Sequence, residues 1–265
     1  MIGGLLPSGV EAVEAFEDIP GEPAHPGEAD LIARAVESRR CEFVTTRRCA
    51  REALGRLGVA PLAIRPGERR EPRWPSGVVG SMTHCAGYRA AAVARTGVVA
   101  GLGIDAEPHQ PLPAGLEPSV MVDVEPTMLT RLVATHPGIH WNRMLFSAKE
   151  AVYKAWFPLT RRWLGFEDVR LAINPAGSFT ARLSVNGTRV DDGPALAALH
   201  GRFLIARDLI VTVVVVPPTT RWAISARAET VERADDARRH TQHRPPSVSA
   251  LDKVPNTTPG AVTGY

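Results

Sequence analysis

The alternation of apolar and polar positions predicts a protein of mixed helices and strands. Residues 141–156 contain neither Gly nor Pro, and their apolar side chains recur at helical spacing on one face, which predicts an amphipathic helix. A second helix is predicted over residues 45–57. Apolar runs bounded by turn residues predict strands at 88–94, 98–105, 169–173, 178–185, 202–206 and 209–216. A helix followed by consecutive strands occurs twice, which is typical of the α+β class.

The same pattern divides the chain into three parts. A Pro-rich stretch at 109–118 separates the first set of elements from the second. After about residue 225 the apolar periodicity stops, and Pro, Thr, Ser and charged residues accumulate. We therefore expect an N-terminal subdomain over 1–108, a C-terminal subdomain over 109–224 and a disordered tail over 225–265.

Composition places the chain among globular proteins. With 265 residues, 44% of them hydrophobic, it can bury a sizeable core. No stretch approaches the ~20 apolar residues of a membrane span, and the first ten residues lack the basic region and apolar core of a secretory signal. The 3 Cys fit no metal-binding spacing, and an odd number of Cys is typical of a reducing compartment. We expect a cytoplasmic protein with no membrane partner.

Two acidic residues follow a buried strand. Residues two apart on a strand point to the same face, so Asp105 and Glu107 can reach one ion. Mg²⁺ is commonly held by one or two carboxylates together with waters and substrate phosphate oxygens. An acidic pair at a strand end also fits a simple turn.

The polar face of the helix over 141–156 carries Ser147, Glu150 and Lys154, and Lys149 precedes the glutamate. A Glu-to-Lys pair four residues apart also has an ordinary explanation, because it stabilises a helix by about 0.2–0.5 kcal/mol. Combined with Asp105 and Glu107, however, three carboxylates beside two lysines indicate a metal and a phosphate in one site.

Arginine is concentrated upstream. Residues 34–73 contain 11 Arg, no Lys and 5 Glu, a charge of +6, whereas the whole chain has +3. The planar guanidinium suits bidentate phosphate recognition, although arginines such as Arg51 and Arg56 also fit a solvated helix face. Nucleic acid is the other candidate partner, but only Phe43 and Trp74 offer stacking surfaces and no known binding motif is present, so we expect no nucleic acid.

The segment GSMTHCAGYRAAAVA places Ser81, Thr83 and His84 in a predicted polar turn before an apolar strand. Hydroxyls, backbone amides and a histidine in a turn can hold a phosphate. A single loop histidine is also an ordinary surface residue.

Four segments in order, TTRRCAREALGRLG, GSMTHCAGYRAAAVA, GLGIDAEP and FSAKEAVYKAWFPLTRRWLGFED, closely resemble the 4′-phosphopantetheinyl transferases of the Sfp/EntD type, in particular the actinobacterial ones. The resemblance covers roughly residues 10–220. It implies two similar subdomains related by a pseudo-twofold, with coenzyme A in the cleft between them. It also implies a monomeric enzyme of the holo-acyl-carrier-protein synthase type. Such an enzyme transfers phosphopantetheine from coenzyme A to a serine of an apo acyl or peptidyl carrier protein with Mg²⁺ and releases 3′,5′-ADP.

The resemblance also implies roles for individual residues. Asp105, Glu107 and Glu150 would bind Mg²⁺, Glu150 would accept the serine proton, and Lys149 and Lys154 would hold the pyrophosphate. The coenzyme A contacts would further include Arg39, Arg47, Gly67, Glu68, Arg69, Arg70, Ser81, Thr83 and His84, with His84 and Arg47 facing the 3′-phosphate.

Two positions depart from the family pattern. Ala106, between the two acids, has no side-chain ligand, and the adenine loop offers Arg65, Arg69 and Arg70 where many members have a lysine. For the acidic carrier, we expect an apolar strip with basic rims, formed around the following residues: Trp141, Arg143, Met144, Met121, Val122 and Met128.

Two other functions use the same residues. A Mg²⁺-dependent phosphohydrolase would release product without a carrier protein, and a regulator would bind coenzyme A without turnover.

Overall fold

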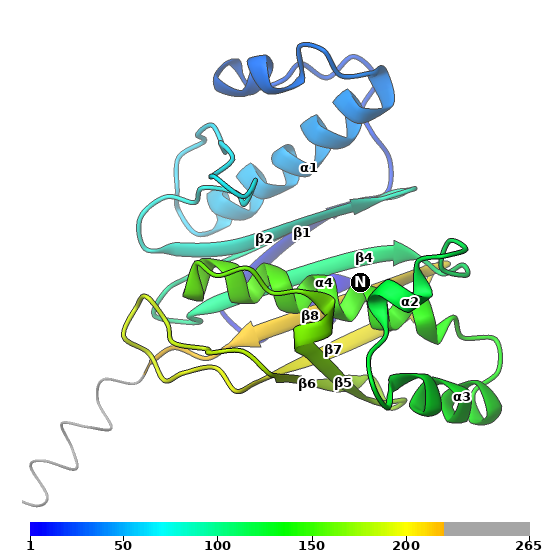
Figure 1. Cartoon of the computed structure of the whole chain (residues 1–265). Helices are drawn as coiled ribbons and strands as arrows, with labels where there is room; N and C mark the ends of the chain where they lie inside the picture. The colour runs from blue at the N-terminus through cyan, green and yellow to red at the C-terminus, as the bar shows by residue number, and fades with distance from the viewer. Residues whose placement is uncertain (220–265) are drawn as a thin grey trace, which may run out of the picture. The chain divides into compact units, whose positions relative to one another are not determined.

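The computed structural model describes residues 1–219, and Figure 1 shows how their elements are arranged. The helices are α1 (Glu37–Arg56), α2 (Glu117–Val120), α3 (Glu125–Thr135) and α4 (Trp141–Thr160), with 3-10 turns η1 (Ile2–Leu5), η2 (Pro26–Ile32) and η3 (Phe166–Asp168). The strands are β1 (Val10–Ala15), β2 (Val78–Cys85), β3 (Tyr88–Arg95), β4 (Gly101–Pro108), β5 (Val169–Asn174), β6 (Ser178–Leu183), β7 (Ala198–Ala206) and β8 (Leu209–Val216). The tail predicted over 225–265 lies outside the described residues.

The strands form two antiparallel sheets, a smaller one in the order β1-β3-β2 and a larger one in the order β4-β8-β7-β6-β5. Helix α1 packs on β1 and β3, and α4 packs on β4 and β8 (Figure 1). The predicted α+β class is confirmed. The helix predicted at 45–57 begins earlier, at Glu37, because residues 37–44 contain no Gly or Pro. The subdomain boundary at 108 stays a prediction; β4, which ends there, belongs to the larger sheet.

Strands β2 and β4 meet at the junction of the sheets through side chains. The hydroxyl of Ser81 accepts a hydrogen bond from Ile104 N at 3.0 Å, and Thr83 Oγ1 accepts one from Ala106 N at 3.0 Å. The polar turn predicted for this segment is therefore wrong, because Ser81 and Thr83 are buried in a strand. Their hydroxyls satisfy backbone amides on the edge of β4 that would otherwise be buried without partners.

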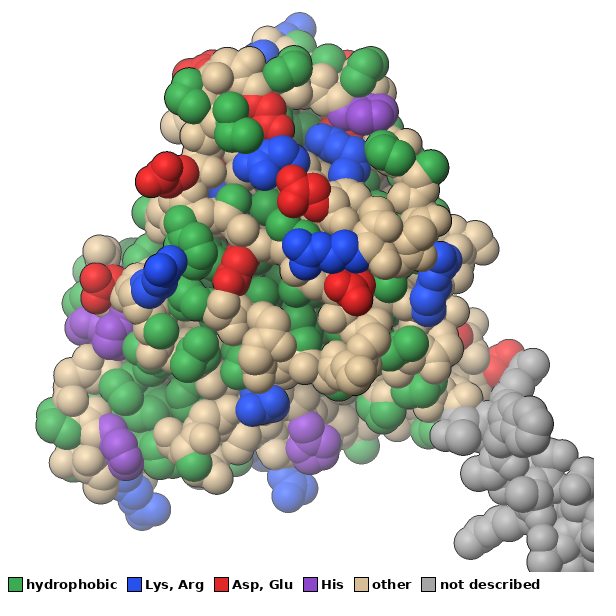
Figure 2. Space-filling view, turned by 180° about the vertical axis from the view of Figure 1, so that it is seen from behind, with side chains coloured by type: hydrophobic (Ala, Val, Ile, Leu, Met, Phe, Trp, Pro, Cys, Tyr) green, Lys and Arg blue, Asp and Glu red, His purple; other side chains and the backbone are tan. Residues whose placement is uncertain are grey.

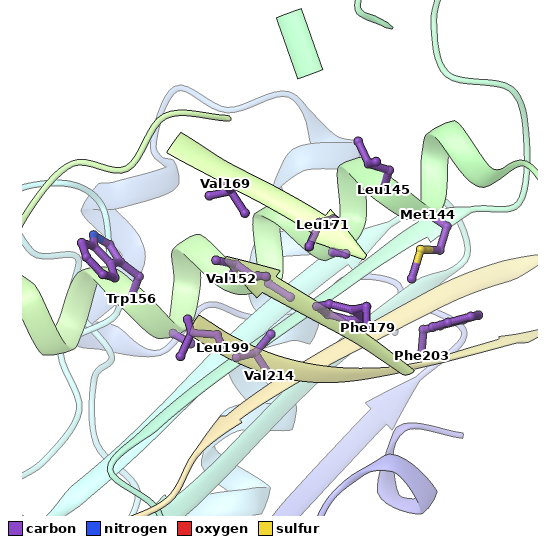
Figure 3. Packing of buried hydrophobic residues seen from close by; sticks show 14 of the residues in the cluster. Met144, Leu145, Val152, Trp156, Val169, Leu171, Phe179, Leu199, Phe203 and Val214 are labelled. Carbon is purple, nitrogen blue, oxygen red and sulfur yellow. The ribbon is translucent and has the colours of Figure 1, made fainter. Parts of the chain in front are cut away.

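Helix α4 lies along the larger sheet over an apolar core. Figure 3 shows side chains of the helix facing strand residues; those labelled are Met144, Leu145, Val152 and Trp156 from α4, with Val169, Leu171, Phe179, Leu199, Phe203 and Val214. The backbones of β4 and α4 approach closely at Gly103, where a Cβ would lie 1.9 Å from the carbonyl oxygen of Ala151. A glycine at this position therefore allows the acidic end of β4 to lie against α4.

Candidate active site

Asp105 is the centre of the candidate site. Its side chain comes from β4 and is almost fully buried. Lys154 of α4 donates to Asp105 Oδ1 at 2.7 Å and to Ile104 O at 3.1 Å, and Thr83 donates to the same Oδ1 at 3.3 Å. The other oxygen, Oδ2, is buried without a hydrogen-bond partner. A buried carboxylate oxygen without a partner is unusual and suits a cation that binds there.

Glu150 lies one helical turn before Lys154 on α4 and is partly buried. Burial raises the pKa of its carboxyl, the nearby charge of Asp105 raises it further, and Lys154 opposes the shift. A carboxylate with a raised pKa holds a proton more readily than an ordinary glutamate. Glu150 is therefore a better proton acceptor than a glutamate with an ordinary pKa.

Glu107 shares the face of β4 with Asp105, as predicted from their spacing. Burial, and then the charge of Asp105, raise the pKa of Glu107 to about 7, although Arg143 opposes the shift. Arg143 Nη1 donates to Glu107 Oε2 at 2.9 Å. This contact was not predicted from the sequence, although Arg143 lies seven residues before Glu150 and therefore on the same side of α4.

The fit of this site to Mg²⁺ depends on how many protein ligands are needed. Within residues 1–219, no three His, Cys, Asp or Glu side chains are gathered closely enough to hold a metal ion by themselves. The predicted set of three metal ligands, Asp105, Glu107 and Glu150, is therefore not formed. Asp105 with its free buried oxygen and Glu107 beside it nevertheless fit the usual arrangement of Mg²⁺, in which substrate phosphate and water complete the coordination.

Arg39 and His84, predicted to contact phosphate, lie together. Arg39 Nη1 donates to His84 Nε2 at 2.7 Å, which requires that nitrogen to be unprotonated. Burial, followed by the charge of Arg39, lowers the pKa of His84. Glu42 Oε2 lies 3.2 Å from Arg39 Nη1 and 3.5 Å from His84 Nδ1, an acidic partner that the sequence analysis missed. The group is thus a neutral imidazole oriented by an arginine.

Arg47 is largely buried on the next turns of α1. Its guanidinium lies 3.5 Å from the centroid of the Phe43 ring, and its Nε donates to Ile64 O at 3.2 Å. Burial lowers the pKa of Arg47 to about 10, so the group stays charged at neutral pH. Other arginines of α1 are held in ion pairs, Arg48 with Glu22 at 3.0 Å and Arg51 with Glu28 at 3.0 Å. On the face shown in Figure 2, Lys and Arg side chains are likewise interspersed with Asp and Glu.

The loop predicted to lie along adenine contains Gly67, Glu68, Arg69 and Arg70. It is closed by hydrogen bonds from Gly67 N to Glu71 O at 2.7 Å and from Arg73 N to Arg65 O at 2.8 Å. Arg65 donates to both carboxylate oxygens of Asp30 at 2.6 and 2.9 Å, so its guanidinium is occupied. Glu68, Arg69 and Arg70 are exposed and remain available for a ligand.

Lys149 does not lie with these residues. It is 1% exposed, and its ammonium donates to Glu125 Oε2 at 2.8 Å and to two backbone carbonyls. The prediction that it holds pyrophosphate is contradicted by this position, because all three of its N–H bonds are used inside the protein. Ser81 is similarly occupied by Ile104 N, and Thr83 acts on Asp105.

The residues predicted for a carrier surface divide into two groups. Trp141 and Met144 are fully buried core residues, so the part of the prediction that rests on them is wrong. Met121 and Met128 are only partly buried, and Met128 Sδ accepts a hydrogen bond from Ile173 N at 3.4 Å.

Comparisons with known proteins cover most of the described chain. Residues 27–94 match the family model of the 4′-phosphopantetheinyl transferase N-terminal domain, and residues 101–214 match that of the 4′-phosphopantetheinyl transferase superfamily. The chain is 51% identical to the 4′-phosphopantetheinyl transferase Svp of Streptomyces mobaraensis over 82% of this chain and 89% of that protein. It is 45% identical to PptT of Mycobacterium tuberculosis over 82% of this chain and 98% of that protein, and 48% identical to Npt of Nocardia iowensis over 81% and 99%.

Proposed function

Since the chain belongs to the 4′-phosphopantetheinyl transferase superfamily, we propose that Asp105, Glu107, Glu150 and Lys154 form the site at which it transfers phosphopantetheine from coenzyme A to a carrier protein. The observation that carries this assignment is the contact between Lys154 and Asp105 at 2.7 Å, with the second oxygen of Asp105 buried and unpaired. This contact brings β4, which carries Asp105 and Glu107, and α4, which carries Glu150, together in one site.

The reaction is a phosphoryl transfer. The serine oxygen of the carrier bonds to the β-phosphorus of coenzyme A, the bond from that phosphorus to the oxygen of the leaving 3′,5′-ADP breaks, and the serine proton must be accepted by a base. Glu150 is the proposed base, because its raised pKa and its place beside Asp105 suit a proton transfer at this point. Mg²⁺, when bound by Asp105 and Glu107, would neutralise charge on the pyrophosphate.

Lys154 has a double role in this proposal. Its ammonium already neutralises Asp105, and 27% of the Lys154 side chain is exposed. A partly exposed lysine beside the acids can also stabilise charge that develops on the leaving group.

Arg39, His84, Arg47 and the loop over 66–70 are proposed to bind the nucleotide part of coenzyme A. An unprotonated His84 Nε2 that accepts from Arg39 leaves the arginine with further N–H groups for the 3′-phosphate.

This proposal predicts a difference between two ligands. Arg39→Gln should weaken coenzyme A binding by about tenfold but leave dephospho-coenzyme A, which lacks the 3′-phosphate, within about twofold. Isothermal titration with both ligands measures this, and Arg40→Gln, which alters the neighbouring exposed arginine, is the control. Equal losses for the two ligands would remove Arg39 from the 3′-phosphate.

Several further assignments stay predictions. They are the choice among fatty-acid, polyketide and peptide carriers, the holo-acyl-carrier-protein synthase subtype, the subdomain division, a monomeric state and a cytoplasmic location. No helix within residues 1–219 is both long and apolar enough to cross a bilayer.

Intact-protein mass spectrometry tests the proposed function. An apo carrier protein incubated with this protein, coenzyme A and Mg²⁺ should gain the mass of one phosphopantetheine group, and 3′,5′-ADP should appear in equal amount. A phosphohydrolase would form product without a carrier, and a regulator would bind coenzyme A without changing it. Either result would replace the transferase assignment.

A further inference from the structure

One carboxylate of α1, that of Glu42, lies among three basic side chains. Its Oε2 accepts a hydrogen bond from Arg39 Nη1 at 3.2 Å and lies 3.5 Å from His84 Nδ1. Its Oε1 lies 4.0 Å from Arg89 Nη2. His84 and Arg89 lie together because they are directly opposite each other in the pairing of β2 with β3. Basic groups from α1, β2 and β3 thus surround one acidic group.

The hydrogen bonds of Arg39 show which of its donors are already used. Its Nη1 carries two hydrogens and donates both to His84 Nε2 at 2.7 Å and to Glu42 Oε2. Because His84 Nε2 is an acceptor, the neutral ring carries its proton on Nδ1, the nitrogen nearer to Glu42. The hydrogens on Nη2 and Nε of Arg39 remain for a ligand, and 45% of this side chain is exposed.

Arg89 is the buried member of the group. Its side chain is 10% exposed, and its Nη2 donates to Asp18 Oδ2 at 2.9 Å. Its Nε is buried and has no hydrogen-bond partner among residues 1–219. A buried donor without a partner is unusual, so the acidic residues present do not use every N–H bond of the group. The group keeps the character of an anion site although Glu42 already lies in it.

Orientation of the arginine alone does not explain a charged residue at this position. A neutral amide oxygen would accept the same hydrogen bond from Arg39. A carboxylate beside a bound phosphate, by contrast, is unfavourable, because like charges repel and the repulsion is stronger where protein replaces water. A phosphate monoester carries up to two negative charges near neutral pH. It would therefore compete with Glu42 for Arg39.

We propose that Glu42 is an internal occupant of the 3′-phosphate site, which neutralises Arg39 while the site is empty and limits how tightly the phosphate is held. This inference rests on the proposed transferase function, in which Arg39 and His84 contact that phosphate. The 3′-phosphate is present on coenzyme A and on the product 3′,5′-ADP, so its binding energy holds substrate and product alike. A carboxylate that weakens this hold favours release of the product.

The test removes the charge of Glu42 and keeps its hydrogen bond. In Glu42→Gln, the amide oxygen can still accept from Arg39 Nη1. The dissociation constants of coenzyme A and of 3′,5′-ADP, measured by isothermal titration, should each fall about tenfold because one repulsive charge is lost. The constant of dephospho-coenzyme A, which lacks the 3′-phosphate, should stay within about twofold. A carboxylate that only positioned Arg39 would give no gain in affinity.

Glu52→Gln is the matched control. Glu52 is the same residue type on the same helix, and it pairs with Arg48 at 3.3 Å outside the proposed site. Its replacement should leave all three dissociation constants unchanged. A second readout is the pKa of His84, followed by NMR. It should fall further in Glu42→Gln, because the charge of Glu42 opposes the lowering by burial and Arg39.

Binding of 3′,5′-ADP that is unchanged or weaker in Glu42→Gln, or a gain that dephospho-coenzyme A shares, would overturn the proposal. If the glutamine variant does not fold, Glu42→Ala decides by the same measurements, since it also removes the charge. Equal binding of coenzyme A and dephospho-coenzyme A by the parent would instead refute the 3′-phosphate site itself. Absence of transfer by a parent protein that still distinguishes the two ligands would refute only the proposed function.

Discussion

Replacing Asp105 with Asn is expected to lower the rate of phosphopantetheine transfer by about 10²–10³-fold. The substitution keeps the shape of the side chain but removes the charge that neutralises Lys154 and that the free oxygen Oδ2 offers to a cation. Rates are measured by intact mass of the carrier over a series of Mg²⁺ concentrations.

Asp192→Asn is the control for this experiment, because it removes a carboxylate of the same type from an exposed position outside the proposed site. Near-normal rates at every Mg²⁺ concentration in the series would refute the metal and electrostatic roles of Asp105. A rate that recovers only as Mg²⁺ is raised would support a ligand role in particular.

Replacing Glu150 with Gln is expected to abolish transfer and to leave the fold intact. The pKa of Glu150 is raised in the folded protein, so the cost of burying this carboxyl grows as the pH rises above its ordinary pKa and is complete above the raised pKa. A neutral glutamine removes this cost, and the unfolding temperature at pH 8 should be unchanged or slightly higher. Calorimetry beside the transfer assay separates the two effects.

The same pKa direction predicts the pH dependence of the parent enzyme. The base form of Glu150 is lost as the pH falls through the raised pKa, so the transfer rate should fall on the acid side, above the pH at which an ordinary glutamate titrates. The fall in transfer rate at acid pH is measured at saturating Mg²⁺ and substrates.

For the glutamine variant, a loss of fold that matches its loss of rate would make Glu150 a structural residue.

The local patterns predicted the main elements and which acidic side chains share a face of a strand, but not the contact between Asp105 and Lys154. Helical periodicity located α4, and its start at Trp141 is confirmed. Because Asp105 and Glu107 are two residues apart in a strand, the sequence predicted that they share one face. In the structure Asp105 also contacts Lys154, which lies 49 residues further along the chain. The shared faces follow from short-range rules, since β and α periods decide which side chains lie on one face. The contact between Asp105 and Lys154 depends on tertiary packing.

The failures have a common physical cause. Lys149 and Lys154 are both lysines of one helix, and only tertiary packing decides that one meets Glu125 in the core and the other meets Asp105. Ser81 and Thr83 are residue types that are common in turns. In the structure, however, their hydroxyls point inward because they accept hydrogen bonds from backbone amides at the edge of β4. Hydrogen-bond partners that lie 22 to 24 residues away in the chain cannot be predicted from helical or strand periodicity.

The pairing of β4 with β8 has a consequence for how the enzyme is made. Asp105 lies opposite Thr212, whose hydroxyl donates to Ser147 O in α4, so the strand that bears the acids is fixed by the last described strand. A growing chain releases β4 from the ribosome long before β8 exists, and contacts of such sequence separation form slowly. The acids and Glu150 are therefore expected to acquire their arrangement only after β8 has left the ribosome.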